Sequence, residues 1–131
     1  MLWNYRGYGR SHGEPNPFII KHDCEVLLNY MKTKMSLTGK IGIYGRSLGG
    51  VPTTHLADRV DMIIADRTFA NFEILADRKF YSTLSRHLFK IGTCNWRSNN
   101  VQNFLHKGAG TCYKVLMTEK MDEIVEVHSS L

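Results

Sequence analysis

Paired cysteines, long apolar runs and clustered charges are all scarce in this chain of 131 residues. The cysteines, Cys24, Cys94 and Cys112, form no C-x-x-C pair, which argues against a disulfide framework and predicts free thiols in a reducing compartment. No run reaches the roughly 18 apolar residues that a membrane helix needs, and the N-terminus lacks the apolar core of a signal peptide. We therefore expect an intracellular, cytoplasmic protein without a transmembrane segment, with peripheral membrane contact left open.

Basic residues exceed acidic ones, 17 to 12, but they are spread along the chain. A single RGYGR segment and a pI near 9.2 are weak signals for nucleic acid, so no nucleic-acid partner is expected. The histidines are isolated, no H-E-x-x-H motif occurs, and GRSLGG lacks the G-K-[ST] ending of a phosphate-binding loop. The sequence therefore predicts no metal site and no cofactor.

Helix and strand signals alternate along the chain. After a loop over 1–17, Asn16 as N-cap and Pro17 in the first turn predict a helix that continues to about Lys34. Short strands are predicted over 40–44, 61–65 and 112–117, with a short helix over 50–57. Such alternation is typical of an α/β fold, a parallel sheet with helices on both faces. Residues 69–106 show no strand pattern and are predicted to form a helical, cap-like insert.

The segment IGIYGRSLGGVP, residues 41–52, places one serine between two glycines directly after a predicted strand. In a G-x-S-x-G elbow the serine occupies a sharp turn from strand to helix, which raises its hydroxyl above the sheet edge. Positions 45 and 49 are expected to require a small residue, here Gly45 and Gly49, because the strand and helix backbones approach each other there. The motif alone also fits a glycine-rich turn with an idle serine, so its context decides the interpretation.

Three segments together resemble the α/β-hydrolase superfamily, and in particular its depalmitoylase-like and serine-aminopeptidase-like members. They are NYRGYGRSHGEPNP (4–17), the elbow segment IGIYGRSLGGVPTTHLA (41–57) and MDEIVEVHSSL (121–131), in the family's order. The resemblance implies a partial α/β-hydrolase fold: a single incomplete domain over 1–131, with the elbow in 18–68, the insert in 69–106 and the acid-bearing strand in 107–131.

The resemblance also implies roles for individual residues. Ser47 is the expected nucleophile, Asp122 the acid, and the N–H of Leu48 one oxyanion donor. Asp66, at the end of the second predicted strand, is the alternative acid. The catalytic histidine should follow the acid, but His128 falls at a non-catalytic position, so the histidine and the second oxyanion donor are expected outside this chain.

The resulting function hypothesis is a serine hydrolase that acts on acyl esters, thioesters or peptides. Its expected partners are small-molecule, acylated or peptide substrates, and the 131 residues alone are expected to be nearly inactive because the base is missing. The alternative is a non-catalytic α/β-hydrolase-fold interaction module, or an inactive truncated product. The acyl group, the leaving group and the oligomeric state leave no signal in the sequence.

Overall fold

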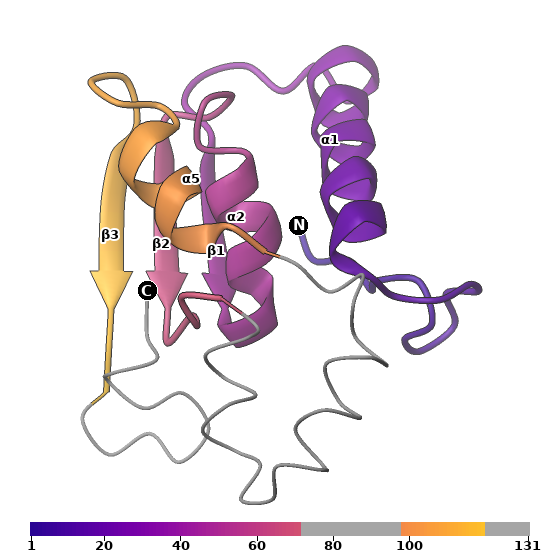
Figure 1. The fold of residues 1–131 in the computed structure, drawn as a ribbon. Coiled ribbons are helices and arrows are strands. Elements are labelled where there is room, and N and C mark those ends of the chain that lie inside the picture. Colours follow the sequence, from indigo (N-terminus) through magenta and orange to yellow (C-terminus); the bar gives the residue numbers. More distant parts are fainter. Residues whose placement is uncertain (72–97, 120–131) are drawn as a thin grey trace, which may run out of the picture.

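Three parallel strands form the centre of the computed structural model, which describes residues 1–71 and 98–119. The strands are β1 (Gly42–Arg46), β2 (Met62–Asp66) and β3 (Tyr113–Met117), and they lie in the order β1-β2-β3 (Figure 1). Helix α1 (Pro17–Lys34) precedes the sheet, and α2 (Gly50–His55) and α5 (Asn100–His106) connect its strands. The parallel α/β class predicted from the alternation of elements is confirmed.

The start of α1 lies where the sequence predicts it. The Asn16 side chain accepts a hydrogen bond from the N–H of Ile19 at 2.9 Å, and Pro17 occupies the first turn. An asparagine N-cap satisfies a helix N–H that has no partner within the helix, and proline has no N–H to lose. Both signals depend only on local sequence, which is why the start at Pro17 could be predicted. The predicted end near Lys34 is confirmed as well.

The strands begin one or two residues later than predicted, and β1 and β2 also end later. The N–H of Ile41 binds the Asp61 carboxylate at 2.7 Å instead of a neighbouring strand. At the other end, Gly45 and Arg46 still pair with β2, so the strand continues to the turn. Strand ends are set by the partner strand, which local sequence does not reveal.

Helix α5 lies within the predicted insert over 69–106, and it packs against α2. It thereby joins the helical layer on the sheet (Figure 1). The remainder of that insert, 72–97, lies outside the described residues, so the prediction of a cap depends on that segment.

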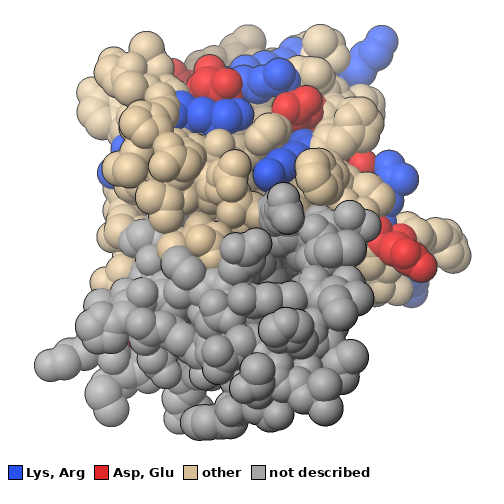
Figure 2. Space-filling view, viewed as in Figure 1, with Lys and Arg blue, Asp and Glu red and all other residues tan. Residues whose placement is uncertain are grey.

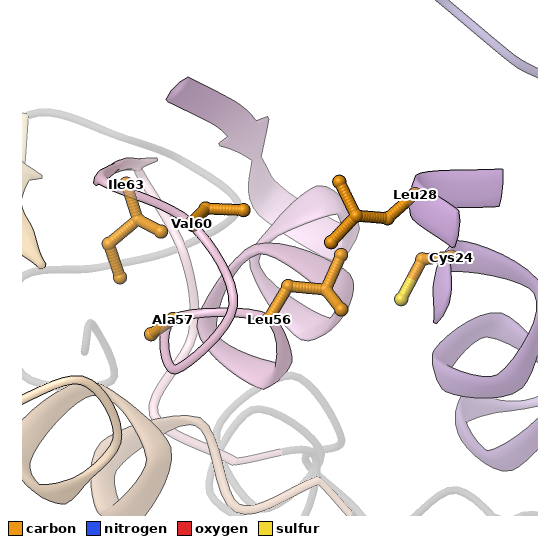
Figure 3. Packing of buried hydrophobic residues seen from close by; sticks show 6 residues of the cluster. All are labelled: Cys24, Leu28, Leu56, Ala57, Val60 and Ile63. Atoms are coloured by element: carbon orange, nitrogen blue, oxygen red, sulfur yellow. The ribbon is translucent and has the colours of Figure 1, made fainter. Parts of the chain in front are cut away.

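A buried apolar cluster joins α1, α2 and β2. Figure 3 shows Leu28 and Leu56 pointing toward each other between the two helices, with Val60 and then Ile63 of β2 farther along the cluster. The cluster consists of Cys24, Leu28, Leu56, Ala57, Val60 and Ile63. Truncating a buried leucine to alanine typically costs about 2–5 kcal/mol, so this cluster holds the elbow helix against the sheet.

The two faces of the sheet differ in their cover. Ile63 and Ala65 point toward the helices and are fully buried. The in-register residues Tyr44, Ile64 and Val115 point to the opposite face, where Tyr44 is 59% exposed. Within 1–71 and 98–119, helices cover only the first face (Figure 1), so the helices expected on the second face are not among the described residues.

Charges of both signs intermingle on the helical side of the molecule. Figure 2 shows blue and red side chains next to one another over the upper part of this face. Arg59 lies 3.8 Å from Glu25, and Lys107 lies 3.8 Å from Asp58. Pairs of this kind, exposed to solvent, contribute at most about 1 kcal/mol each, so they shape the surface more than they stabilise the fold.

Candidate active site

Ser47 follows β1 directly and adopts the backbone conformation of a strained turn. Its φ is +51°, in the left-handed region that residues other than glycine rarely occupy. A short 3-10 turn, η1 (Ser47–Gly49), begins at this serine and leads into α2. A left-handed residue costs roughly 1–2 kcal/mol. Strain of this kind at a strand-to-helix turn is a feature from which a functional role can be inferred.

Gly45 lies where strand and helix backbones meet. A Cβ at this position would overlap both the carbonyl oxygen of Gly49 and the hydroxyl of Thr53. Because one of these atoms belongs to the backbone, no side-chain movement could make room. The structure thus gives a physical reason for a glycine two residues before Ser47.

The close approach after Ser47 concerns Gly50 more than Gly49. A Cβ at Gly49 would meet only the Tyr5 hydroxyl, at 3.8 Å, which is an ordinary contact. A Cβ at Gly50 would overlap the side chain of Thr68. The sequence predicted that position 49 must be small, but the structure shows this requirement at position 50. The presence of a second glycine, Gly50, directly after Gly49 was the sequence signal for it.

We expect Gly50→Ala to destabilise the protein by about 1–3 kcal/mol through overpacking. The backbone of Gly50 is helical, with φ −63° and ψ −27°, so alanine brings no conformational strain of its own. The cost should therefore come from Thr68, and the double variant Gly50→Ala, Thr68→Gly should be more stable than the sum of the single changes. Urea unfolding of the whole native protein measures all four corners of this cycle.

Gly49→Ala is the matched control for this prediction. It adds the same methyl group one residue earlier, on a backbone that is also helical at φ −60° and ψ −18°. Its free energy of unfolding should stay within about 1 kcal/mol of the parent. Equal tolerance of alanine at positions 49 and 50 would contradict the close approach to Thr68.

A pocket of about 300 Å³ lies beside the elbow. Leu48 and Gly49 contribute to its wall from the turn, and Trp3 and Tyr5 contribute from the N-terminal segment. Burial raises the pKa of Tyr5 to about 12, so this phenol is neutral at physiological pH. The pocket is thus lined by apolar and aromatic residues and by the neighbours of Ser47 in the chain, Arg46 and Leu48, but not by Ser47 itself.

Asp66, the alternative acid, is already engaged within the sheet. Its Oδ2 accepts a hydrogen bond from the Tyr44 hydroxyl, and its Oδ1 accepts one from Arg67 Nε at 3.0 Å. The Tyr44 hydrogen bond holds the pKa of the Asp66 carboxyl below its ordinary value, and Arg67 acts in the same direction. The side chain is only 6% exposed, so Asp66 is a buried, ionised carboxylate with both oxygens occupied.

Asp122, the expected acid, lies outside the described residues, as does His128. Strand β3 ends at Met117 in register with Asp66, so Thr118 and Glu119 follow it at the same edge of the sheet as Ser47. His55 lies at the far end of α2, where its Nε2 contacts Glu25 at 2.7 Å. Burial lowers the pKa of His55, and the Glu25 contact opposes this shift. His55 therefore lies at the opposite end of α2 from Ser47 and contacts Glu25 in the helical layer.

Two residues beside the elbow were missed by the sequence reasoning. Arg67 follows β2 with a φ of +47°, and its Nη1 contacts Glu119 Oε2 at 2.6 Å. The sequence places an arginine after one predicted strand and a glutamate after the next. Because the carboxyl ends of parallel strands meet at one edge of the sheet, this placement is a weak signal that the two residues lie close together. Their partnership depends on the register between β2 and β3, which the sequence does not state.

The fold and the elbow together define a class of protein. Strand β1 is followed directly by the left-handed Ser47, a 3-10 turn and then α2, with crowded glycines at positions 45 and 50. This arrangement is similar to the nucleophile elbow of α/β hydrolases. The serine lies at the carboxyl edge of the sheet, where open α/β sheets place their ligands.

Comparison with known proteins leads to the same family. The chain is 36% identical over 76 residues to the alpha/beta hydrolase domain-containing protein WAV2 of Arabidopsis thaliana, covering 54% of the chain and 25% of that protein. It is 35% identical over 78 residues to protein bem46 of Schizosaccharomyces pombe, covering 56% and 26%. Against the alpha/beta hydrolase domain-containing protein 17C of Xenopus tropicalis the identity is 37% over 60 residues, covering 45% and 19%. No family model matches the chain, and no solved structure matches it significantly.

Over about half of its residues the chain is therefore similar to proteins of the α/β-hydrolase family, which is a partial match. The matched segment covers about a fifth to a quarter of the length of these relatives. Among the residues described, no helix has the length and apolar character to cross a membrane. Within the same residues no group of three or more His, Cys, Asp or Glu could hold a metal ion.

Proposed function

We propose that the protein is a serine hydrolase in which Ser47 is the nucleophile. The observation that supports this most directly is the left-handed backbone of Ser47 at the strand-to-helix turn. A non-glycine residue in that conformation is held there by its surroundings, here the close packing at Gly45 and Gly50. The names of the relatives support a hydrolase of the α/β family. The substrate class proposed is an acyl ester, thioester or peptide.

The proposed reaction follows the acyl-transfer pattern. Ser47 Oγ attacks the acyl carbonyl while a histidine outside this sequence takes the hydroxyl proton. The Leu48 N–H donates to the developing oxyanion, and Asp122 orients the histidine. The histidine then returns the proton to the leaving group as its bond to the acyl carbon breaks, and water releases the acyl group from Ser47. The engagement of Asp66 with Tyr44 and Arg67 supports Asp122 as the acid.

A fluorophosphonate probe tests the nucleophile in the whole native protein. Such a probe phosphonylates an activated serine with loss of fluoride, so we expect one modified serine per active molecule. Trypsin should release the label on peptide 47–59, in which Ser47 is the one serine. Mass spectrometry of the digest locates it.

Ser36 provides the matched control for the labelling. It is also left-handed, at φ +47°, but lies between α1 and β1, away from the elbow. Ser36→Ala should label like the parent, and Ser47→Ala should not label. Equal labelling of the Ser47→Ala variant would refute the proposed nucleophile, and a parent protein without any label would favour the interaction module.

A further inference from the structure

The guanidinium of Arg46 has unused hydrogen-bond donors directly beside the elbow. Arg46 is the last residue of β1, it is exposed, and Ser47 follows it in the chain. Within residues 1–71 and 98–119, this guanidinium makes no hydrogen bond and no ion pair. An arginine side chain carries several N–H donors and stays protonated at physiological pH. A positive charge with open donors therefore lies next to the proposed nucleophile.

The carboxylate that pairs with Arg46 in the sheet is bound by other residues. Arg46 lies in register with Asp66, but the Asp66 carboxylate accepts its hydrogen bonds from Tyr44 and Arg67. Arg67 also binds Glu119, at 2.6 Å. The low pKa of Asp66 comes mainly from the Tyr44 hydrogen bond, and Arg46 lowers it further only as a nearby charge. In the part of the chain that the structure describes, the Arg46 N–H groups are therefore free to bind an anion.

Arg46 also contributes to the wall of the pocket beside the elbow, whose volume is about 300 Å³. The N-terminal segment supplies aromatic surface to this pocket, where the rings of Trp3 and Tyr5 contact edge to face with centroids 5.9 Å apart. Leu48 adds apolar surface from the turn. A pocket with mostly apolar walls and one charged group suits a ligand with an apolar body and an oppositely charged end. An acyl chain that ends in a carboxylate has both parts.

We propose that Arg46 is a specificity-determining residue, which binds a carboxylate on the acyl chain of the substrate while the pocket beside the elbow holds the apolar part of that chain. This inference rests on the proposed function and names its substrate class, esters or thioesters of acids with a second, ionised carboxyl group. Both chain neighbours of Ser47 line the pocket, and consecutive Cα atoms lie about 3.8 Å apart. An acyl chain of a few carbons can therefore join a carbonyl at Ser47 to a carboxylate at Arg46.

Two p-nitrophenyl esters with the same carbon chain test this proposal on the whole native protein. The acyl chain of the hydrogen adipate ends in a carboxylate, and that of the hexanoate ends in a methyl group. We expect the parent to hydrolyse the adipate with the higher kcat/KM. Arg46→Gln should lower the ratio of kcat/KM for adipate to that for hexanoate about 10-fold, because hydrogen bonds to a charged group are lost. Arg46→Lys should retain part of the ratio, since lysine keeps the charge but lacks the planar fork.

Arg10→Gln is the matched control. It makes the same change of charge at an exposed arginine in the segment before α1, which does not line the pocket beside the elbow. Its ratio of adipate to hexanoate hydrolysis should equal that of the parent. A general loss of stability lowers both rates together and leaves this ratio unchanged, so the ratio separates binding by Arg46 from a merely structural role. Added salt should reduce the preference of the parent for the adipate, because it screens an exposed charge pair.

The outcomes distinguish this inference from the proposed function. A parent protein that neither hydrolyses an ester nor labels at Ser47 with the fluorophosphonate would refute the proposed function itself. A labelled parent that hydrolyses only the hexanoate, or neither ester, would contradict the proposed substrate class. An active, labelled parent whose ratio of adipate to hexanoate hydrolysis is the same in Arg46→Gln as in Arg10→Gln would overturn the role of Arg46 alone. The proposal stands if the ratio falls in Arg46→Gln and not in the control.

Discussion

Replacing Ser47 with alanine is expected to lower kcat of the whole native protein by about 10⁶-fold. Removing the nucleophile of a serine hydrolase costs about as much as removing its entire triad, because the residues act as one unit. The residual rate should come from substrate binding and the oxyanion donors. Steady-state hydrolysis of p-nitrophenyl butyrate measures the effect, and Ser36→Ala, left-handed at φ +47°, is the control that should keep full activity.

The stability of variants at Ser47 should depend on backbone strain and not on activity. Glycine occupies left-handed backbone without strain, whereas alanine does not. At φ +51° the Ser47→Gly variant should therefore be more stable than Ser47→Ala by about 1 kcal/mol, and both should be inactive. Chemical unfolding of the two variants checks this. An alanine variant as stable as the glycine variant would show that the turn stores no strain.

Replacing Asp122 with asparagine is the second large effect that we expect, a decrease of about 10⁴-fold in kcat. An asparagine in the acid's place holds the histidine in the wrong tautomer, so the base cannot take the serine proton. The same change at Asp66 should lower kcat by no more than about 10²-fold, because it only weakens the contacts of Asp66 with Tyr44 and Arg67. The kinetics of the two variants, measured side by side, identify the acid.

The stability of these two variants should be ordered the other way. Asp66 is buried with both oxygens occupied, so Asp66→Asn places an amide where two donors converge. Its unfolding midpoint should fall below that of Asp122→Asn. A decrease of 10⁴-fold on changing Asp66, together with an active Asp122→Asn variant, would transfer the acid's role to Asp66.

Local signals were read correctly from the sequence, and signals that depend on distant partners were not. The start of α1 follows from Asn16 and Pro17 alone. The close approach at Gly50 involves Thr68 across the turn, and the contact from Arg67 to Glu119 spans two strands. No spacing in the sequence encodes the register that brings these residues together. Asp122 stays a prediction because it lies outside the described residues.

The elbow is the clearest case of a site that sequence could foresee in part. A serine between two glycines directly after a strand predicts the turn, because the sharp bend from strand to helix requires small residues on both sides of the serine. Which glycine after Ser47 is crowded could not be foreseen, since that depends on how the helix packs against Thr68, which follows β2. The same holds for Asp66, whose engagement with Tyr44 requires the two strands to be paired in parallel.

The order of the strands in the sheet has a consequence for biosynthesis. Because β1, β2 and β3 are neighbours in both sequence and space, each strand can pair with one that has already left the ribosome. Pairing β1 with β2 closes a much shorter loop than pairing β2 with β3, so it loses less chain entropy. The crossover unit of β1, α2 and β2, which includes the turn at Ser47, should therefore form on the nascent chain before β3 is synthesised.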